Sequence, residues 1–256
     1  MINLIKIKKR MKKFTNALML GAISIATLVG ISSCNKTANM TIDPAKATLH
    51  SGDTVLLSVV GAPAEVSFET TNNYVAHLSG DTLFAFFVGD AVVTATSGDQ
   101  KATCAVTVTP EYTLFTEPVT EWGYSAAELK AKHGGEATEQ EGTILYVQDQ
   151  ENGVMELYQF DNDALASSML VAAATERNKD IVYFLVERYA YAGEDNGVLY
   201  FVNALDIDDV TVVIQLDIIE LQGQQFYRAW YRPYSSQQNM PALKIQKGKH
   251  NLPALR

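Results

Sequence analysis

Turn-forming residues divide the first part of this chain at short and regular intervals. Between residues 41 and 109, clusters of Gly, Asn, Asp, Ser and Pro recur at 51–53, 61–63, 71–73, 79–81, 89–90 and 97–99. Intervals of about 8 to 12 residues leave room for short strands and are typical of a β-sandwich. Residues 41–109 are therefore predicted to form one.

The last of these segments alternates between two faces, as a half-buried strand does. Ala102, Cys104, Val106 and Val108 fall on one face, and Thr103, Thr107 and Thr109 fall on the other. Cys104 is therefore expected to be a small core residue. A reactive thiol would need an exposed, electropositive setting, and Lys101 is the only basic residue nearby in the sequence.

Four segments of this region resemble the group 2 bacterial immunoglobulin-like domains. They are TLHSGDTVLL at 48–57, FETTNNYVA at 68–76, VGDAVVTA at 88–95 and AVTV at 105–108. Phe68 stands where the family usually has Trp, and Thr70 and Thr71 replace a usual pair of serines. The resemblance implies a seven-stranded spacer or adhesion-type module with no chemistry of its own.

The chain changes character after Pro110, and residues 111–234 are predicted to form a second domain. Ser125 and Glu128 make a capping box, which predicts a helix that ends at Gly134. A second, amphipathic helix is predicted because Ile181, Phe184, Leu185, Arg188 and Tyr189 share one face. Strands are predicted at 142–148, 154–160, 167–173, 198–204, 210–218 and 224–231.

The predicted fold is mainly β: an N-terminal immunoglobulin-like β-sandwich, then an α+β domain with a mostly antiparallel sheet. Residues 235–256 carry two prolines and few large apolar side chains, and they are predicted to be a disordered tail. The second domain also resembles uncharacterised lipoproteins of Bacteroides-like bacteria, at Trp122-Gly123-Tyr124-Ser125, at Tyr158-Gln159-Phe160 and at residues 185–189. That resemblance implies no particular activity.

The N-terminus has the pattern of an export signal. A basic stretch from Lys6 to Lys13 precedes an apolar run at 17–29, which is too short to span a bilayer as a helix. The run ends in Gly-Ile-Ser-Ser-Cys at 30–34, which resembles the lipobox of bacterial lipoproteins. The resemblance implies a signal peptide at 1–33, lipid on Cys34 and a tether at 34–40. An ordinary secretory signal is the alternative, but small residues crowd the positions that a processing enzyme must accommodate.

Lipid on Cys34 would hold the protein on the outer membrane. Surface-exported lipoproteins of some Gram-negative groups carry acidic residues directly after this cysteine, whereas this chain has Asn35, Lys36 and Thr37. A periplasm-facing position is therefore expected. With Cys34 acylated, Cys104 has no partner and no intramolecular disulfide is expected.

Acidic residues outnumber basic ones once the signal peptide is removed. The sequence has 29 Asp and Glu residues, none of them in the signal peptide, and 20 Lys and Arg residues, six of which lie there. The mature chain thus keeps 14 basic residues and a net charge of −15. Charge of this sign repels phosphate backbones and anionic headgroups, so neither nucleic acid nor direct electrostatic binding to a membrane is expected.

One strip of side chains suggests a ligand. Phe226, Tyr227, Trp230, Tyr231 and Tyr234 are interleaved with Arg228 and Arg232. Aromatic rings stack on sugars and arginines add fixed hydrogen-bond donors, so Tyr227, Arg228, Trp230 and Tyr231 are candidate ligand-binding residues. The alternative is structural, because aromatic residues are favoured in strands and alternation sends about half of them inward.

Neither a metal site nor a catalytic set is predicted. His50, His77, His133 and His250 are far apart in the sequence. Asp206, Asp208 and Asp209 lie between two predicted strands, where Asp is an ordinary turn residue, and no calcium-loop pattern surrounds them. Nucleophile-elbow and phosphate-loop motifs are absent from the sequence, and no cofactor is expected.

These observations favour a non-enzymatic lipoprotein of the cell envelope. In this hypothesis an immunoglobulin-like spacer presents the α+β domain to a protein or glycan partner. The alternative is a hydrolase acting on glycan or peptidoglycan, with two carboxylates supplied by distant strands, because such a pair leaves no local motif.

Overall fold

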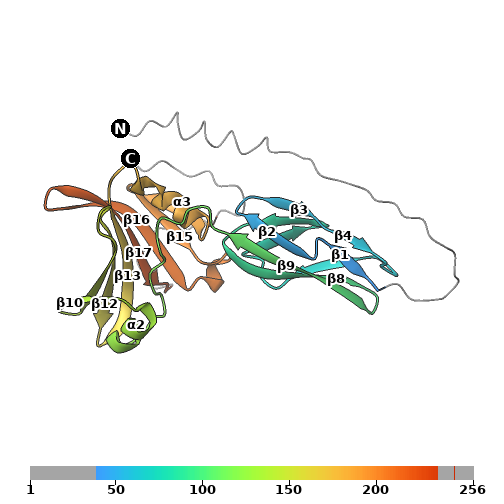
Figure 1. The fold of residues 1–256 in the computed structure, drawn as a ribbon, viewed down its shortest axis with the longest axis horizontal. Coiled ribbons are helices and arrows are strands. Elements are labelled where there is room, and N and C mark those ends of the chain that lie inside the picture. Colours follow the sequence, from blue (N-terminus) through green and yellow to red (C-terminus); the bar gives the residue numbers. More distant parts are fainter. Residues whose placement is uncertain (1–38, 236–244, 246–256) are drawn as a thin grey trace.

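The computed structural model describes residues 39–235 and Ile245. The predictions for the signal peptide, for Cys34 and for all of the tail except Ser235 and Ile245 lie outside these residues. The described chain is mainly β with antiparallel sheets, as predicted. Figure 1 shows two β-rich bodies side by side along the long axis of the molecule.

The N-terminal domain is built from short strands in three sheets. The strands are β1 (Thr41–Asp43), β2 (Lys46–His50), β3 (Thr54–Leu56), β4 (Ser58–Val60), β5 (Ser67–Thr70), β6 (Ala76–Ser79), β7 (Thr82–Ala85), β8 (Gly89–Ser97) and β9 (Gln100–Thr109). The sheet orders are β2-β9-β8-β5, β3-β7-β6 and β1-β4. The pairing of β2 with β9 is parallel, while the other strand pairs of this domain are antiparallel.

The core of this domain lies between the first two sheets. Val93, Cys104 and Val106 come from the larger sheet, while Ala76 and Leu83 come from the smaller one. Cys104 is fully buried, and burial raises the pKa of its thiol, so the interpretation of this cysteine as a core residue agrees with its position.

The second domain is one twisted sheet of eight strands. They are β10 (Thr138–Gln140), β11 (Thr143–Asp149), β12 (Val154–Asp161), β13 (Ala164–Ala173), β14 (Ala190–Asp195), β15 (Val198–Val202), β16 (Val212–Leu221) and β17 (Gln224–Pro233). Their order is β10-β11-β12-β13-β17-β16-β15-β14, and every pairing is antiparallel.

Both helices of this domain pack on the same face of the sheet. Helix α2 (Ala126–His133) begins at Ser125, whose hydroxyl accepts a hydrogen bond from the Glu128 amide while the Glu128 carboxylate accepts one from the Ser125 amide. The predicted capping box is thus present, and it lowers the pKa of Glu128. Leu129 of α2 packs with Ile144, and helix α3 (Ile181–Val186) packs over β13, β16 and β17.

Several element boundaries differ from those predicted. The second helix is shorter: the 3-10 turn η1 (Asn178–Asp180) leads into only six α-helical residues, and Arg188 and Tyr189 follow the helix. Strands β10 and β14 were not predicted. Strand β10 is exposed along its whole length, and a register shift between Tyr191 and Gly193 interrupts the alternation of β14, so neither gives a two-residue hydrophobic period.

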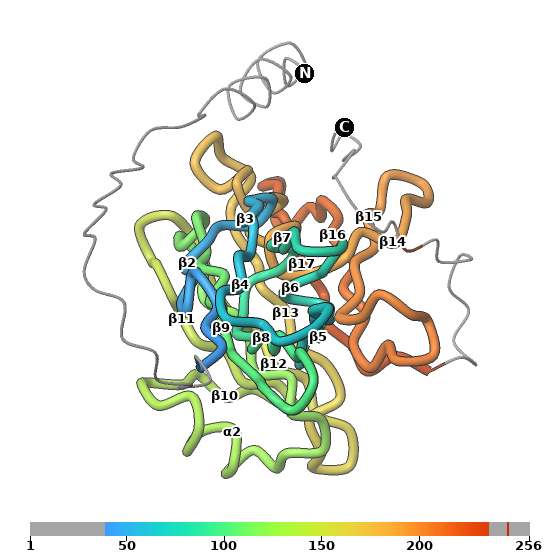
Figure 2. The backbone as a smooth tube through the Cα atoms, turned by 90° about the vertical axis from the view of Figure 1, so that its right-hand side faces the viewer, coloured from blue at the N-terminus to red at the C-terminus, as the bar shows by residue number. Residues whose placement is uncertain are grey.

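The two domains meet in a polar and aromatic junction. The Tyr74 hydroxyl lies within hydrogen-bond distance of the Arg188 and Val202 carbonyls and accepts a hydrogen bond from the Ala190 amide. Phe87 stacks on Tyr74 and is buried in a cluster whose other buried members come from the second domain. Figure 2 looks along the long axis, with the strands of the N-terminal domain in front of the eight-stranded sheet of the second domain.

A buried carboxylate fastens the segment that joins the domains. Glu187 accepts hydrogen bonds from the Glu111 amide at 2.8 Å and the Tyr112 amide at 3.1 Å, and it forms an ion pair with Arg188. The Glu187 carbonyl also accepts a hydrogen bond from the Val88 amide of the N-terminal domain at 2.7 Å. These contacts fix the orientation of the two domains relative to each other.

Candidate functional site

The face of the large sheet opposite its helices carries a continuous row of side chains. Strand register aligns, from one edge inward, Thr138, Leu145, Leu157, Met169, Trp230, Gln215 and Tyr200. Among the described residues, Tyr200 belongs to one of the four hydrophobic clusters, but Leu145, Leu157, Met169 and Trp230 belong to none. We call this row, together with Val147, Arg228 and Arg232 on the same face of the sheet, the open face.

Alternation divides the predicted ligand-binding strip between the two faces of β17. Tyr227 and Tyr231 are 4% and 0% exposed and pack in the core under α3, so they cannot contact a ligand on the other side. Arg228 and Trp230 are half-buried on the open face. The prediction that these four residues form one site is therefore wrong, because a strand sends successive side chains to opposite faces.

Trp230 lies between two arginines on the open face. Arg228 and Arg232 are the residues two positions before and two after it, and their guanidinium carbons lie 5.4 Å and 4.2 Å from the ring centroid. Such contacts are cation–π interactions. Two guanidinium groups therefore already lie close to the indole ring.

The two arginines differ in what neutralises them. Arg228 makes a bidentate ion pair with Asp217, directly across the strand pair, with N–O distances of 3.0 Å and 2.5 Å. Arg232 stands opposite Val213, and within the described residues no carboxylate lies within ion-pair distance of it. Burial lowers the pKa of Arg232.

The side chains of Arg228, Trp230 and Arg232 stack along β17, and we call them the arginine ladder. Two buried donors in this ladder lack acceptors. The indole Nε1 of Trp230 and the Nε of Arg232 are both inaccessible to solvent and make no hydrogen bond within the described residues. A buried donor without a partner costs roughly 1–3 kcal/mol. The Arg228–Trp230–Arg232 ladder is therefore rich in donors and short of acceptors.

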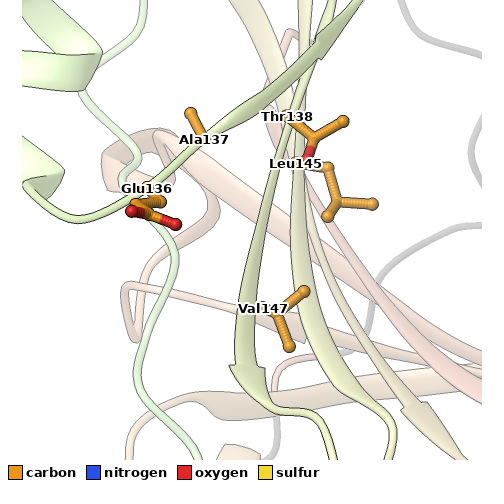
Figure 3. Close-up of a pocket in the computed structure, with 5 residues that line it drawn as sticks. All are labelled: Glu136, Ala137, Thr138, Leu145 and Val147. Carbon is orange, nitrogen blue, oxygen red and sulfur yellow. The ribbon is translucent and has the colours of Figure 1, made fainter.

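A shallow hollow of about 350 Å³ lies toward one edge of the same sheet. Thr138, Leu145 and Val147 line it together with Glu136 and Ala137 (Figure 3). Val147 is 56% exposed. The hollow thus extends the open face toward the β10–β11 edge.

A second polar cluster, which the sequence did not predict, lies on the helix-covered face. The Glu156 carboxylate is buried and accepts hydrogen bonds from the side chains of Gln148 and Tyr158, and His133 Nε2 lies 2.9 Å from it. Burial, with Glu156 next in importance, raises the pKa of Tyr158 well above its usual range. The sequence did hold one signal of this burial. Alternation along the strand puts Glu156 on the same face as the apolar Val154 and Tyr158.

The geometry of the Glu156 cluster favours an anchoring role. His133 is the last residue of α2 and stacks on Tyr146, with ring centroids 3.5 Å apart, so its contact with Glu156 ties the end of the helix to the sheet. Three side-chain groups already surround the carboxylate, and Glu156 is 1% exposed, which leaves it no path to a substrate. We therefore place the candidate site on the open face.

The remaining sequence candidates have ordinary contacts. Asp206 caps the short 3-10 turn η2 (Ile207–Asp209) by accepting a hydrogen bond from the Asp208 amide. His50 Nδ1 lies 3.1 Å from the Thr109 carbonyl, and His77 Nδ1 lies 2.7 Å from Asn73 Oδ1. In residues 39–235 and at Ile245, no group of three or more His, Cys, Asp or Glu side chains is arranged to hold a metal ion.

No helix in the described part of the chain has the length and apolar character needed to cross a membrane.

Searches of protein families and of curated proteins returned no match. Among solved structures, the chain is similar to domains 4–9 of the surface layer protein SbsC, with 11% identity over 79% of this chain and a TM-score of 0.24. It is also similar to domains 5–6 of that protein, with 13% identity over 77% of this chain, 84% of that chain and a TM-score of 0.21. The chain spans only 28% of the longer SbsC structure.

Proposed function

We propose that this protein is a non-enzymatic lipoprotein of the cell envelope that binds a glycan on the open face of its second domain. In this proposal lipid on Cys34 anchors the chain to the outer membrane, facing the periplasm, and residues 41–109 are an immunoglobulin-like spacer. The hydrolase alternative stays a prediction, and none of the contacts described here favours it.

The observation that carries the proposal is the open face itself. A sheet in a globular domain normally buries apolar side chains beneath another layer, yet Leu157, Met169 and Trp230 lie half-buried outside every cluster of the described chain. A glycan suits this surface better than a purely apolar partner does. Sugars present both CH faces and hydroxyl groups, and the row combines aliphatic side chains with Gln215 and the arginine ladder.

The junction between the domains supports a presenting role. Because Tyr74, Phe87 and Glu187 connect the domains, the open face keeps a fixed direction relative to the N-terminal domain and to any anchor before it.

The test replaces Met169 with aspartate in the soluble chain of residues 35–256, which contains every described residue. We expect Met169→Asp to abolish binding to polysaccharide fractions of the cell envelope, because it puts a charge at the centre of the row. The free energy of unfolding should fall by no more than about 1–2 kcal/mol, since Met169 is only partly buried. Calorimetric titration measures the first quantity and urea denaturation the second.

Ile207→Asp is the matched control, because Ile207 is a 38% exposed apolar residue in the short turn between β15 and β16, outside the row. It should leave binding unchanged. Equal loss of binding in both variants, or full binding by Met169→Asp, would refute the open face as the binding surface. Capture of a protein instead of a glycan by the native chain, lost in Met169→Asp, would replace the glycan by a protein partner.

A further inference from the structure

We infer that the ligand of the open face is an acidic glycan, one of whose oxyanions is bound by Arg232 beside Trp230. This inference rests on the proposed glycan binding and names the chemical class of the ligand. It differs from the prediction made from the sequence, in which sugar rings stack on aromatic faces.

The first step is that Arg232 lacks a counterion. Four arginines lie in the described residues, and Arg177, Arg188 and Arg228 each form an ion pair with a carboxylate. Arg232 has none within the described residues, although it is half-buried beside Trp230. Placing a charge in a partly desolvated position is unfavourable unless an anion accompanies it.

The second step is that no side chain outside the described residues can supply that anion. All 29 Asp and Glu residues of the sequence lie between residues 43 and 220, and residues 1–38 and 236–256 contain none. Every side-chain carboxylate therefore has a described position, and none lies within ion-pair distance of Arg232. Within residues 1–256 the one remaining source of an anion is the carboxylate of Arg256, and we assign the anion to another molecule.

The third step concerns the chemistry of the ligand. A guanidinium group presents parallel N–H donors that match the two oxygens of a carboxylate or phosphate. Trp230 Nε1 and Arg232 Nε are inaccessible to solvent, so the oxyanion would contact the other N–H groups of the Arg232 guanidinium, a side chain that is only partly buried. Gln215 is aligned with Trp230 in the row, where it can contact sugar hydroxyl groups. An acidic sugar satisfies both the charge and the hydrogen-bonding groups.

The test compares three probes by calorimetry against residues 35–256: tetragalacturonate, its methyl ester, and a mannose oligosaccharide that carries phosphate. We expect the native chain to bind at least one acidic probe, and Arg232→Gln to weaken that binding at least tenfold. The methyl ester should bind the native chain and Arg232→Gln with equal, lower affinity. Tighter binding of the carboxylate or of the phosphate probe identifies the source of the oxyanion.

Arg177→Gln is the control, because Arg177 is a 57% exposed arginine that pairs with Asp149 at 3.9 Å. It should bind the acidic probe as the native chain does. The free energy of unfolding of Arg232→Gln should change little, because the lost cation–π contact with Trp230 is offset by the removal of an unpaired charge. A fall in stability with unchanged binding would mean that the ladder is purely structural, and it would overturn the inference.

The outcomes separate this inference from the proposed function. Equal binding of acidic and neutral probes by the native chain and by Arg232→Gln would overturn the oxyanion site and keep glycan binding. Failure of every glycan to bind would overturn both. If acidic probes bound only when the carboxylate of Arg256 was converted to an amide, that carboxylate would be the partner of Arg232, and the inference would be wrong.

Discussion

Replacing Cys34 with serine is expected to remove all incorporation of an alkyne-tagged palmitate from the protein in growing cells. The thiol of Cys34 is the proposed acylation site, and serine at this position would not receive the diacylglycerol group. Each buried CH₂ of an acyl chain contributes about 0.8 kcal/mol to membrane binding, so losing the acyl chains removes the anchor. The labelled fatty acid is detected by gel fluorescence after click coupling.

Cys104→Ala provides the matched control, because Cys104 is the only other cysteine of the chain and is fully buried. It should carry as much label as the native protein. Label that persists in Cys34→Ser would contradict lipidation at Cys34. A native protein without any label would favour an ordinary secretory signal.

The second large effect is expected at the junction between the domains. Glu187→Ala should lower the free energy of unfolding of residues 35–256 by about 3–5 kcal/mol, the range for breaking a buried ion pair from one side. The substitution leaves Arg188, whose side chain is 11% exposed, without its closest carboxylate, and it leaves the amides of Glu111 and Tyr112 without an acceptor. Urea denaturation followed by circular dichroism measures the change.

Glu176→Ala is the matched control, since Glu176 is 80% exposed and pairs with Lys179, three residues later in the sequence. An exposed pair of this kind contributes about 0–1 kcal/mol, so the variant should be nearly as stable as the native chain. A loss below about 1 kcal/mol in Glu187→Ala would mean that the junction contributes little to stability. The fixed orientation of the open face would then lose its main support.

Period-two alternation predicted most strands of the second domain, but it could not place the surfaces that cover them. In β16, Val213 interrupts the alternation because it is buried in the cluster beside the N-terminal domain, so both faces of the strand are covered there. The exposed strand β10 and the irregular strand β14 depend on pairing with their neighbours, which no local pattern records.

The candidate site was predicted only in part, for a related reason. The sequence showed aromatic and basic residues interleaved in 226–234, and alternation alone assigns Arg228, Trp230 and Arg232 to one face and Tyr227 and Tyr231 to the other. Which of these faces is buried depends on where α2 and α3 pack. The missing counterion of Arg232 could not be predicted either, since it depends on the distances to Asp217 and every other carboxylate.

The central claim, that the open face contacts a ligand in the cell, is tested most directly by a photo-crosslinking amino acid placed at Met169 in the full-length protein and, separately, at Ile207. The account predicts an ultraviolet-dependent, carbohydrate-positive adduct from position 169 and none from position 207. Adducts of equal yield from both positions, or no carbohydrate adduct from position 169, would contradict it.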